Sequence, residues 1–168
     1  EKNDYTVMVL GGRIGDKIHI IDYRRLRVMG NLEKLDAMKE LLHDWSVIGR
    51  QDNGIWFPTY STCDIWSEAV QYQASLEADF KRVCLNQENL YNLIWHPVKG
   101  FRADKLARFR GIMGMFEDRK IVFNRYRNFT TLFEELTNFG VSSRDDCVDA
   151  LVWLVNGLMK RGKLQLDF

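Results

Sequence analysis

The start of the chain alternates between apolar and polar residues and then changes to a helical spacing. The stretch 5–14 is rich in β-branched residues, and 17–27 alternates in the same way after a Gly-Asp pair at 15–16. Two such runs around a Gly-Asp turn predict an antiparallel hairpin. Asn31 is then expected to cap a helix, because the apolar residues that follow recur at helical spacing. The pattern predicts a hairpin followed by a helix over about 32–45.

The rest of the chain alternates between short strands and helices. Residues 49–62 carry Gly, Asn and Pro and predict a loop or an added hairpin. The elements expected after it are a strand at 64–70, a helix reaching Cys84, a strand at 93–98 stopped by Pro97, a helix at 103–119, a short strand at 120–123, a helix at 129–140 ended by Gly140, and a last helix from the Asp cluster near 145 to about Lys160. This order predicts an α/β fold with a mixed central β-sheet flanked by helices, in which 64–68 and 93–96 run parallel beside the hairpin.

Composition bounds the class of protein. The 168 residues are 46% hydrophobic and 28% charged, which is ordinary for one soluble domain with a core. The sequence shows no signal peptide and no apolar run long enough for a bilayer, so a cytoplasmic setting without a membrane partner is expected. Three cysteines without a Cys-x-x-Cys pattern indicate neither a zinc site nor a disulfide framework.

The net charge of +1 excludes a strong global attraction to nucleic acid, so any basic surface is local. Basic clusters occur at 22–27, 99–110, 125–127 and 160–163. Arginines in such clusters can bind phosphate through two parallel hydrogen bonds. A solvated face explains any one cluster, whereas four on a nearly neutral chain modestly favour a polyanionic partner.

The stretch "SRDDCVDALVWLV" at 143–155 places three carboxylates before a wholly apolar run. On a helix Asp145, Asp146 and Asp149 share one face, so their charges repel and call for a neutralising partner. That partner is Arg144, a lysine or a divalent metal, and oxygen-only ligands favour Mg²⁺ or Mn²⁺. A helix cap accounts for one or two of the acids. The third favours the metal interpretation.

Glu68 is a second candidate ligand, because it ends the strand expected at 64–70. An acid in such an apolar segment is costly unless it is paired or bound to a cation. A helix-start acid explains it equally well. Two metals held by such acids could activate a water and stabilise the leaving oxygen of a phosphodiester, and the site would need a further acid from another strand.

The order of elements and acids resembles a known family. Four stretches, "NDYTVMVLGG", "IWSEAVQYQASL", "RADKLARFRG" and "RDDCVDAL", occur in the order that the family shows and span nearly the whole chain. They resemble the C-terminal nuclease domain of the large terminase subunit of tailed phages, which has an RNase H-like fold. Each stretch is weak alone, and the ordered set is fairly specific.

The resemblance implies a role for each acid. Glu68 would be the second metal-ligating acid, and Asp146, with Asp145 and Asp149 beside it, would supply the third, in a two-metal site for Mg²⁺ or Mn²⁺. Basic residues would contact the DNA backbone or support the site. They are Lys105 and Arg108, with Lys99 and Arg102 in the same cluster.

The resemblance also implies a biological role. It predicts metal-dependent cleavage of double-stranded DNA during viral genome packaging, in the cytoplasm of the host cell. The expected partners are the terminase ATPase domain, the small subunit and the portal protein. No G-x-x-x-x-G-K-[ST] motif of an ATPase motor occurs in the sequence.

One departure from the family leaves alternatives open. The first acidic strand of the family is expected before Asp4 and Tyr5, upstream of Glu1, unless Asp22 takes its place in a different register. The alternatives are another RNase H-like nuclease, such as a resolvase or transposase core, and a non-catalytic DNA-docking or assembly module. Metal-dependent nicking of plasmid DNA separates an enzyme from a docking module.

Overall fold

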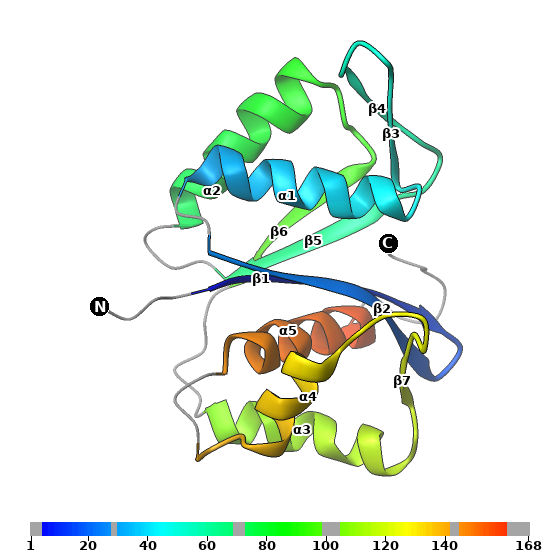
Figure 1. The fold of residues 1–168 in the computed structure, drawn as a ribbon, viewed down its shortest axis with the longest axis vertical. Coiled ribbons are helices and arrows are strands. Elements are labelled where there is room, and N and C mark those ends of the chain that lie inside the picture. Colours follow the sequence, from blue (N-terminus) through cyan, green and yellow to red (C-terminus); the bar gives the residue numbers. More distant parts are fainter. Residues whose placement is uncertain (1–4, 28–29, 69–72, 99–104, 142–144, 161–168) are drawn as a thin grey trace. The chain divides into compact units, whose positions relative to one another are not determined.

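The computed structural model describes residues 5–27, 30–68, 73–98, 105–141 and 145–160 (Figure 1). The chain forms two compact units. The first consists of residues 1–27 and 102–166, and the second of residues 28–101 and 167–168. The expectation of a single domain stays a prediction, and each unit is described by itself. The described helices are too short or too polar to cross a membrane.

The first unit is built on the predicted hairpin. Strands β1 (Thr6–Ile14) and β2 (Lys17–Leu26) pair antiparallel, and Gly15 adopts the left-handed φ of +62° that the turn requires. Strand β7 (Ile121–Phe123) pairs parallel with β2. The sheet is therefore mixed, as predicted.

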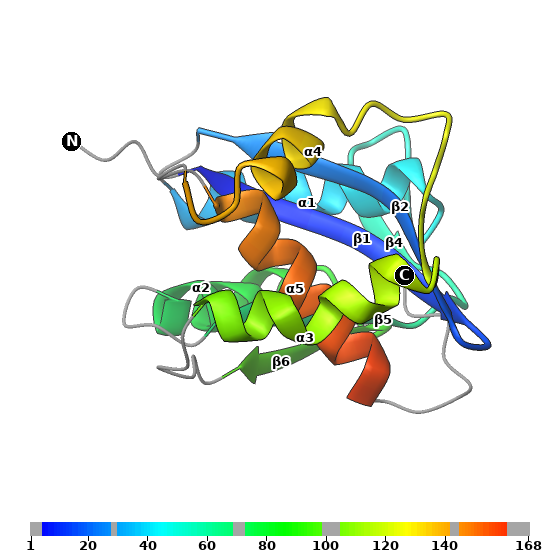
Figure 2. The same cartoon turned by 90° about the horizontal axis from the view of Figure 1, so that it is seen from below.

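Three helices cover one face of this sheet (Figures 1 and 2). Helix α5 (Asp146–Lys160) packs on β1, and α3 (Lys105–Glu117) and α4 (Thr130–Thr137) pack against α5. The buried residues of α5 recur at helical spacing, which explains why this face forms the centre of the core. They are Cys147, Val148, Leu151, Val152, Val155 and Leu158. The predicted final helix is confirmed.

Helix α5 approaches β1 most closely at Gly11. A Cβ atom added there would lie 2.8 Å from the His19 carbonyl oxygen of β2 and 2.8 Å from Cδ2 of Leu154 on α5. The first of these neighbours is backbone and cannot move without disturbing the sheet. Gly11 lies where the β1–β2 register shifts, so a bulge and a close contact coincide.

The second unit combines helices with two small sheets. Its elements are α1 (Asn31–Asp44), β3 (Ile48–Arg50), β4 (Trp56–Pro58), β5 (Cys63–Glu68), α2 (Gln73–Phe80), a π-helix (Lys81–Gln87) and β6 (Leu93–Val98). β3 and β4 form the added hairpin, and β5 and β6 pair parallel. The π-helix continues α2 with wider hydrogen bonding, such as Glu88 N–H to the Val83 carbonyl at 3.0 Å.

Two local predictions are wrong. Asn31 does not cap α1, because Gly30 is the N-cap and the Asn31 amide donates to Ser75 and Asp79 at 3.1 and 3.0 Å. Pro97 does not stop β6 but lies inside it, opposite Ser67. In the described part of the chain β6 pairs on one side only, where proline is tolerated. The expectation that 64–68 and 93–96 lie beside the hairpin in one sheet joins the two units and stays a prediction.

Substitution of Gly11 tests the close packing of α5 on the hairpin. Gly11→Ala should lower the free energy of unfolding by about 1–3 kcal/mol, as overpacked sites do. Gly114→Ala is the matched control, because nothing lies within 4 Å of its added Cβ on α3. That change should raise stability by about 0.5–1 kcal/mol. Urea denaturation measures both, and equal effects at the two glycines would contradict the close contact.

Candidate functional site

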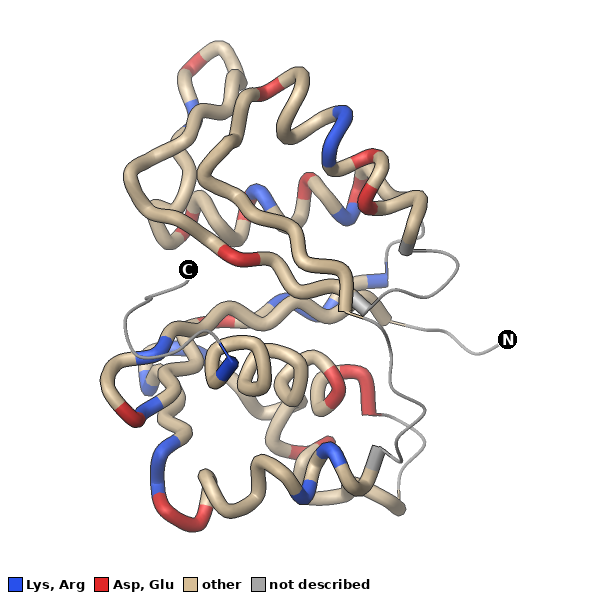
Figure 3. The backbone as a smooth tube through the Cα atoms, turned by 180° about the vertical axis from the view of Figure 1, so that it is seen from behind, with Lys and Arg blue, Asp and Glu red and all other residues tan. Residues whose placement is uncertain are grey.

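The acids singled out in the sequence lie at the start of α5. Asp146 is the first residue of the helix, and the Asp145 carbonyl accepts the Asp149 N–H at 2.9 Å. All three side chains are half-buried. Figure 3 shows red segments at the beginning of α5, where these acids lie. Their negative charge complements the positive end of the helix dipole.

A residue outside the cluster caps this helix. Glu135 of α4 is only 6% exposed, and its Oε2 accepts the Cys147 N–H at 2.8 Å. Its Oε1 lies 3.7 Å from Nε of Arg25, an ion pair too long for a hydrogen bond. Sequence reasoning missed Glu135, although its spacing of three positions from the buried Leu132 puts an acid on the apolar face of α4. The Cys147 N–H is thus capped from α4 and not by the cluster.

The predicted metal site is not assembled within the described residues. There, no group of three or more His, Cys, Asp and Glu side chains is arranged to hold a metal ion. Glu68 ends β5, where its backbone pairs with Val98. Its side chain lies outside the described part of the structure, and it belongs to the second unit. The convergence of Glu68 with Asp146 therefore stays a prediction.

Only some of the basic residues predicted to contact DNA lie in the described part of the structure. Lys99 and Arg102 lie outside the described residues, and Lys105 begins α3. The Arg108 guanidinium lies 5.1 Å from the ring centroid of Trp153 on α5, a cation–π contact. Its Nη1 is buried and has no hydrogen-bond partner among the described residues.

Trp153 links Arg108 to the acidic cluster. On α5, Trp153 follows Asp149 by four positions and Asp146 by seven, so the three share one face of the helix. The cation–π contact therefore holds a guanidinium against the same helix face as two acids. The acids were singled out by their spacing and Arg108 by the resemblance, but neither gave any sign that a tryptophan lies between them.

A second buried acid lies on the parallel strands of the other unit. The Asp64 side chain of β5 is fully buried, and its Oδ1 lies 2.5 Å from Nε2 of His96 on β6. The His96 ring stacks on Trp66 with centroids 4.3 Å apart. The contacts orient the imidazole from two sides. Sequence reasoning missed this pair, for which the signal was an acid and a histidine in two apolar strands.

Two of the three cysteines are poor nucleophiles or ligands. All three thiols are free and buried. Burial raises the pKa of Cys84 to about 12. Burial, followed by the charge of Glu135, raises the pKa of Cys147 to about 12. Since only the thiolate attacks or ligates metal, neither thiol is reactive near neutral pH. The oxygen atoms of the acids are therefore the relevant chemistry at the start of α5.

Comparison with known proteins identifies the family. The model of the family described as "Terminase RNaseH-like domain" matches residues 1–158. The chain belongs to this family. The match runs through both units of this terminase domain and includes Glu68 and the acidic cluster. No curated protein matches the sequence.

Family membership confirms two of the predictions made from the sequence. The resemblance to a terminase nuclease domain was correct, and so was the RNase H-like α/β fold class with a mixed sheet and flanking helices. Membership supports a nuclease-type role for the terminase domain and an association with DNA and the packaging machinery.

Alkylation tests the state of the thiols. With the pKa values of Cys84 and Cys147 near 12, each should be neutral in more than about 99% of folded molecules at pH 8. Iodoacetamide at pH 8 should therefore modify these two thiols only after unfolding in urea, as measured by mass spectrometry of digested protein. Rapid modification of Cys147 in the folded protein would mean that the start of α5 opens readily.

Proposed function

We propose that this terminase RNaseH-like domain is a divalent-metal-dependent endonuclease that cuts double-stranded DNA during viral genome packaging. The observation that carries the proposal is the family match over residues 1–158, a range that includes Glu68 and the acidic cluster. The ATPase domain, the small subunit and the portal protein are the proposed partners in packaging. A DNA-docking module without catalysis is the outcome to be distinguished.

The proposed ligands are oxygen donors from two segments of the chain. Asp146, with Asp145 and Asp149, would hold Mg²⁺ or Mn²⁺ together with Glu68. Carboxylate donors suit these hard cations, and the half-buried start of α5 suits a site that substrate must reach. Because the described residues alone do not gather three ligands, Glu68 is essential to the proposal.

Each group has a definite task in this proposal. When bound, the two metals would supply an activated water and stabilise the leaving oxygen. The carboxylates would hold them, with Glu135 fixing the start of α5 through the Cys147 N–H. The Arg108 guanidinium, held over Trp153, would contact a phosphate of the DNA backbone. Because Nη1 is buried, a phosphate would be contacted through the other nitrogens of the guanidinium.

A thermal melt with and without Mn²⁺ tests Asp146 as a ligand. The wild-type chain should gain stability from the metal by mass action, about 2.7 kcal/mol at a hundred times the dissociation constant. Asp146→Ala should lose this gain, beyond the roughly 0.5–2 kcal/mol that a helix-start acid contributes without metal. Asp118→Ala is the control, because it removes an exposed acid of the same unit.

The outcomes of this melt separate the two interpretations of the acids. An equal response to Mn²⁺ in wild type and Asp146→Ala would remove Asp146 from the ligand set. Plasmid nicking in Mn²⁺ then tests the enzyme itself, and it should be compared with a chain extended upstream, since the resemblance predicts a further acid there. DNA binding without nicking in both chains would favour the docking module.

Replacement of Arg108 tests a conflict between stability and function. A buried nitrogen without a partner costs about 1–3 kcal/mol, whereas the cation–π contact returns about 0.5–1 kcal/mol. Arg108→Met should therefore leave the free energy of unfolding unchanged or raise it by about 1 kcal/mol, and should weaken binding to duplex DNA. Arg110→Met, at an exposed position of α3, is the control. A clear loss of stability in Arg108→Met would assign the arginine to packing alone.

A further inference from the structure

A buried carboxylate outside the acidic cluster reaches the start of α5. Glu135 of α4 is only 6% exposed, and its Oε2 accepts the Cys147 N–H at 2.8 Å. Cys147 directly follows Asp146, the first residue of α5. The charge of Glu135 therefore lies beside the backbone that carries the acidic cluster, and it is shielded from solvent.

The second oxygen of this carboxylate faces a cation. Oε1 of Glu135 lies 3.7 Å from Nε of Arg25 on β2, and the Arg25 side chain is 17% exposed. Neither of these two atoms has a hydrogen-bond partner among the described residues. At this distance the two groups interact through their charges and not through a hydrogen bond. We call Arg25 and Glu135 the buried charge pair.

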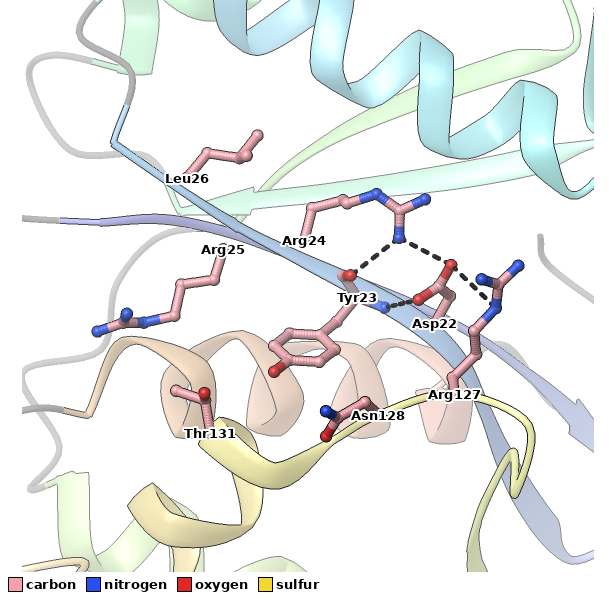
Figure 4. Close-up of a pocket in the computed structure, with 8 residues that line it drawn as sticks. All are labelled: Asp22, Tyr23, Arg24, Arg25, Leu26, Arg127, Asn128 and Thr131. Atoms are coloured by element: carbon pink, nitrogen blue, oxygen red, sulfur yellow. Dashed lines mark hydrogen bonds and ion pairs between the residues drawn. The ribbon is translucent and has the colours of Figure 1, made fainter.

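Each member of the buried charge pair is held by a different neighbour. The Arg25 guanidinium lies 3.4 Å from the ring centroid of Tyr5, which is a cation–π contact. Figure 4 shows its side chain leaving β2 in a different direction from that of Arg24, as expected for successive residues of a strand. Glu135 is held by the Cys147 N–H. The hairpin thus fixes the cation, and the start of α5 fixes the anion.

Charges at this place act on any cation that binds at the acidic cluster. The Coulomb energy is twice as large for a divalent ion as for a monovalent one, and a buried charge is screened less than an exposed one. Glu135 should therefore strengthen the binding of Mg²⁺ or Mn²⁺. Arg25 carries the opposite charge and should weaken it.

A pair that only stabilised the fold would behave differently. Removing either member would then lower stability, and it would leave metal affinity unchanged or weaken it in both cases. Opposite changes in affinity are expected only from two charges of opposite sign. The other partners of the acidic cluster stay the same in each variant, so they do not enter the comparison.

We propose that the buried charge pair sets the affinity of the acidic cluster for a divalent cation, with Glu135 raising it and Arg25 lowering it. Neither residue is a metal ligand in this proposal, and both act through the cluster. The inference rests on the proposed function for the place of the metal, and it does not depend on DNA cleavage.

Electron paramagnetic resonance of free Mn²⁺ tests the pair in the absence of DNA. Glu135→Gln keeps an oxygen that accepts the Cys147 N–H and removes the charge, so it should weaken Mn²⁺ binding roughly tenfold. Arg25→Met should tighten binding roughly threefold, because the charge that it removes is partly exposed and more strongly screened. Glu134→Gln is the control, because it removes an exposed acid next to Glu135 and should change affinity by less than about twofold.

A double variant covers the case in which a single change prevents folding. Arg25→Met leaves Glu135 buried without its counter-charge, which is strongly destabilising, whereas replacement of both members buries no charge. Arg25→Met combined with Glu135→Gln should bind Mn²⁺ roughly threefold more tightly than Glu135→Gln alone. Each charge is thus removed in two backgrounds, and each variant is first melted in EDTA to show that it is folded.

Four results would overturn the proposal. One is equal Mn²⁺ affinity in the folded wild type, Glu135→Gln and the double variant. Another is weaker binding in both Glu135→Gln and Arg25→Met, which would leave the pair a role in holding α5 alone. A third is an equal loss in Glu134→Gln, which would reduce the effect to net charge. The last is a wild-type chain that binds no Mn²⁺.

The proposed function can fail independently of this inference. Mn²⁺ affinity that follows the two charges, without nicking of plasmid DNA, would reject the nuclease and keep the charge pair. Metal-dependent nicking with Mn²⁺ affinity that ignores both charges would reject the charge pair and keep the nuclease.

Discussion

The packing of α5 on the β1–β2 hairpin is the contact on which the first unit depends. One face of α5 supplies the centre of the core, and its first turn carries the acidic cluster. The absence of a side chain at Gly11 lets Leu154 approach the strand. Because a helix is rigid over such a length, the depth of Leu154 also fixes the position of Asp146. The apolar contact and the candidate site are therefore parts of one element.

The sequence predicted the elements whose signals are local. The hairpin followed from alternation around a Gly-Asp turn, and α5 followed from a long apolar stripe behind acids. The prediction that Asn31 caps α1 was wrong because its side chain has partners on α2, which only the tertiary structure brings near. The π-helix after α2 was missed because its apolar spacing resembles that of an α-helix. Local patterns thus located the elements, whereas the partners of side chains that bond to distant segments could not be predicted.

The candidate site shows the same contrast between local signals and partners from distant segments. Three acids at one helix start were visible in the sequence, since their spacing is short. Glu135, which bonds the second residue of that helix, comes from α4, and its partner could not be read from spacing. The contact of Arg108 with Trp153 likewise joins two helices. Sequence shows which groups are present, whereas their partners are set by how the helices pack.

The side chains at the edge of β2 have a consequence for the behaviour of the protein in solution. The Tyr23 N–H donates to Oδ1 of Asp22 at 2.8 Å, and the Tyr23 carbonyl accepts from Arg24 at 3.0 Å. Backbone groups on a strand edge are otherwise a template for another strand, and a charge placed there discourages such pairing. Asp22 and Arg24 thus protect the sheet from self-association. Because the Tyr23 backbone groups are already hydrogen-bonded to side chains of the same strand, this edge offers fewer groups to a strand of another molecule.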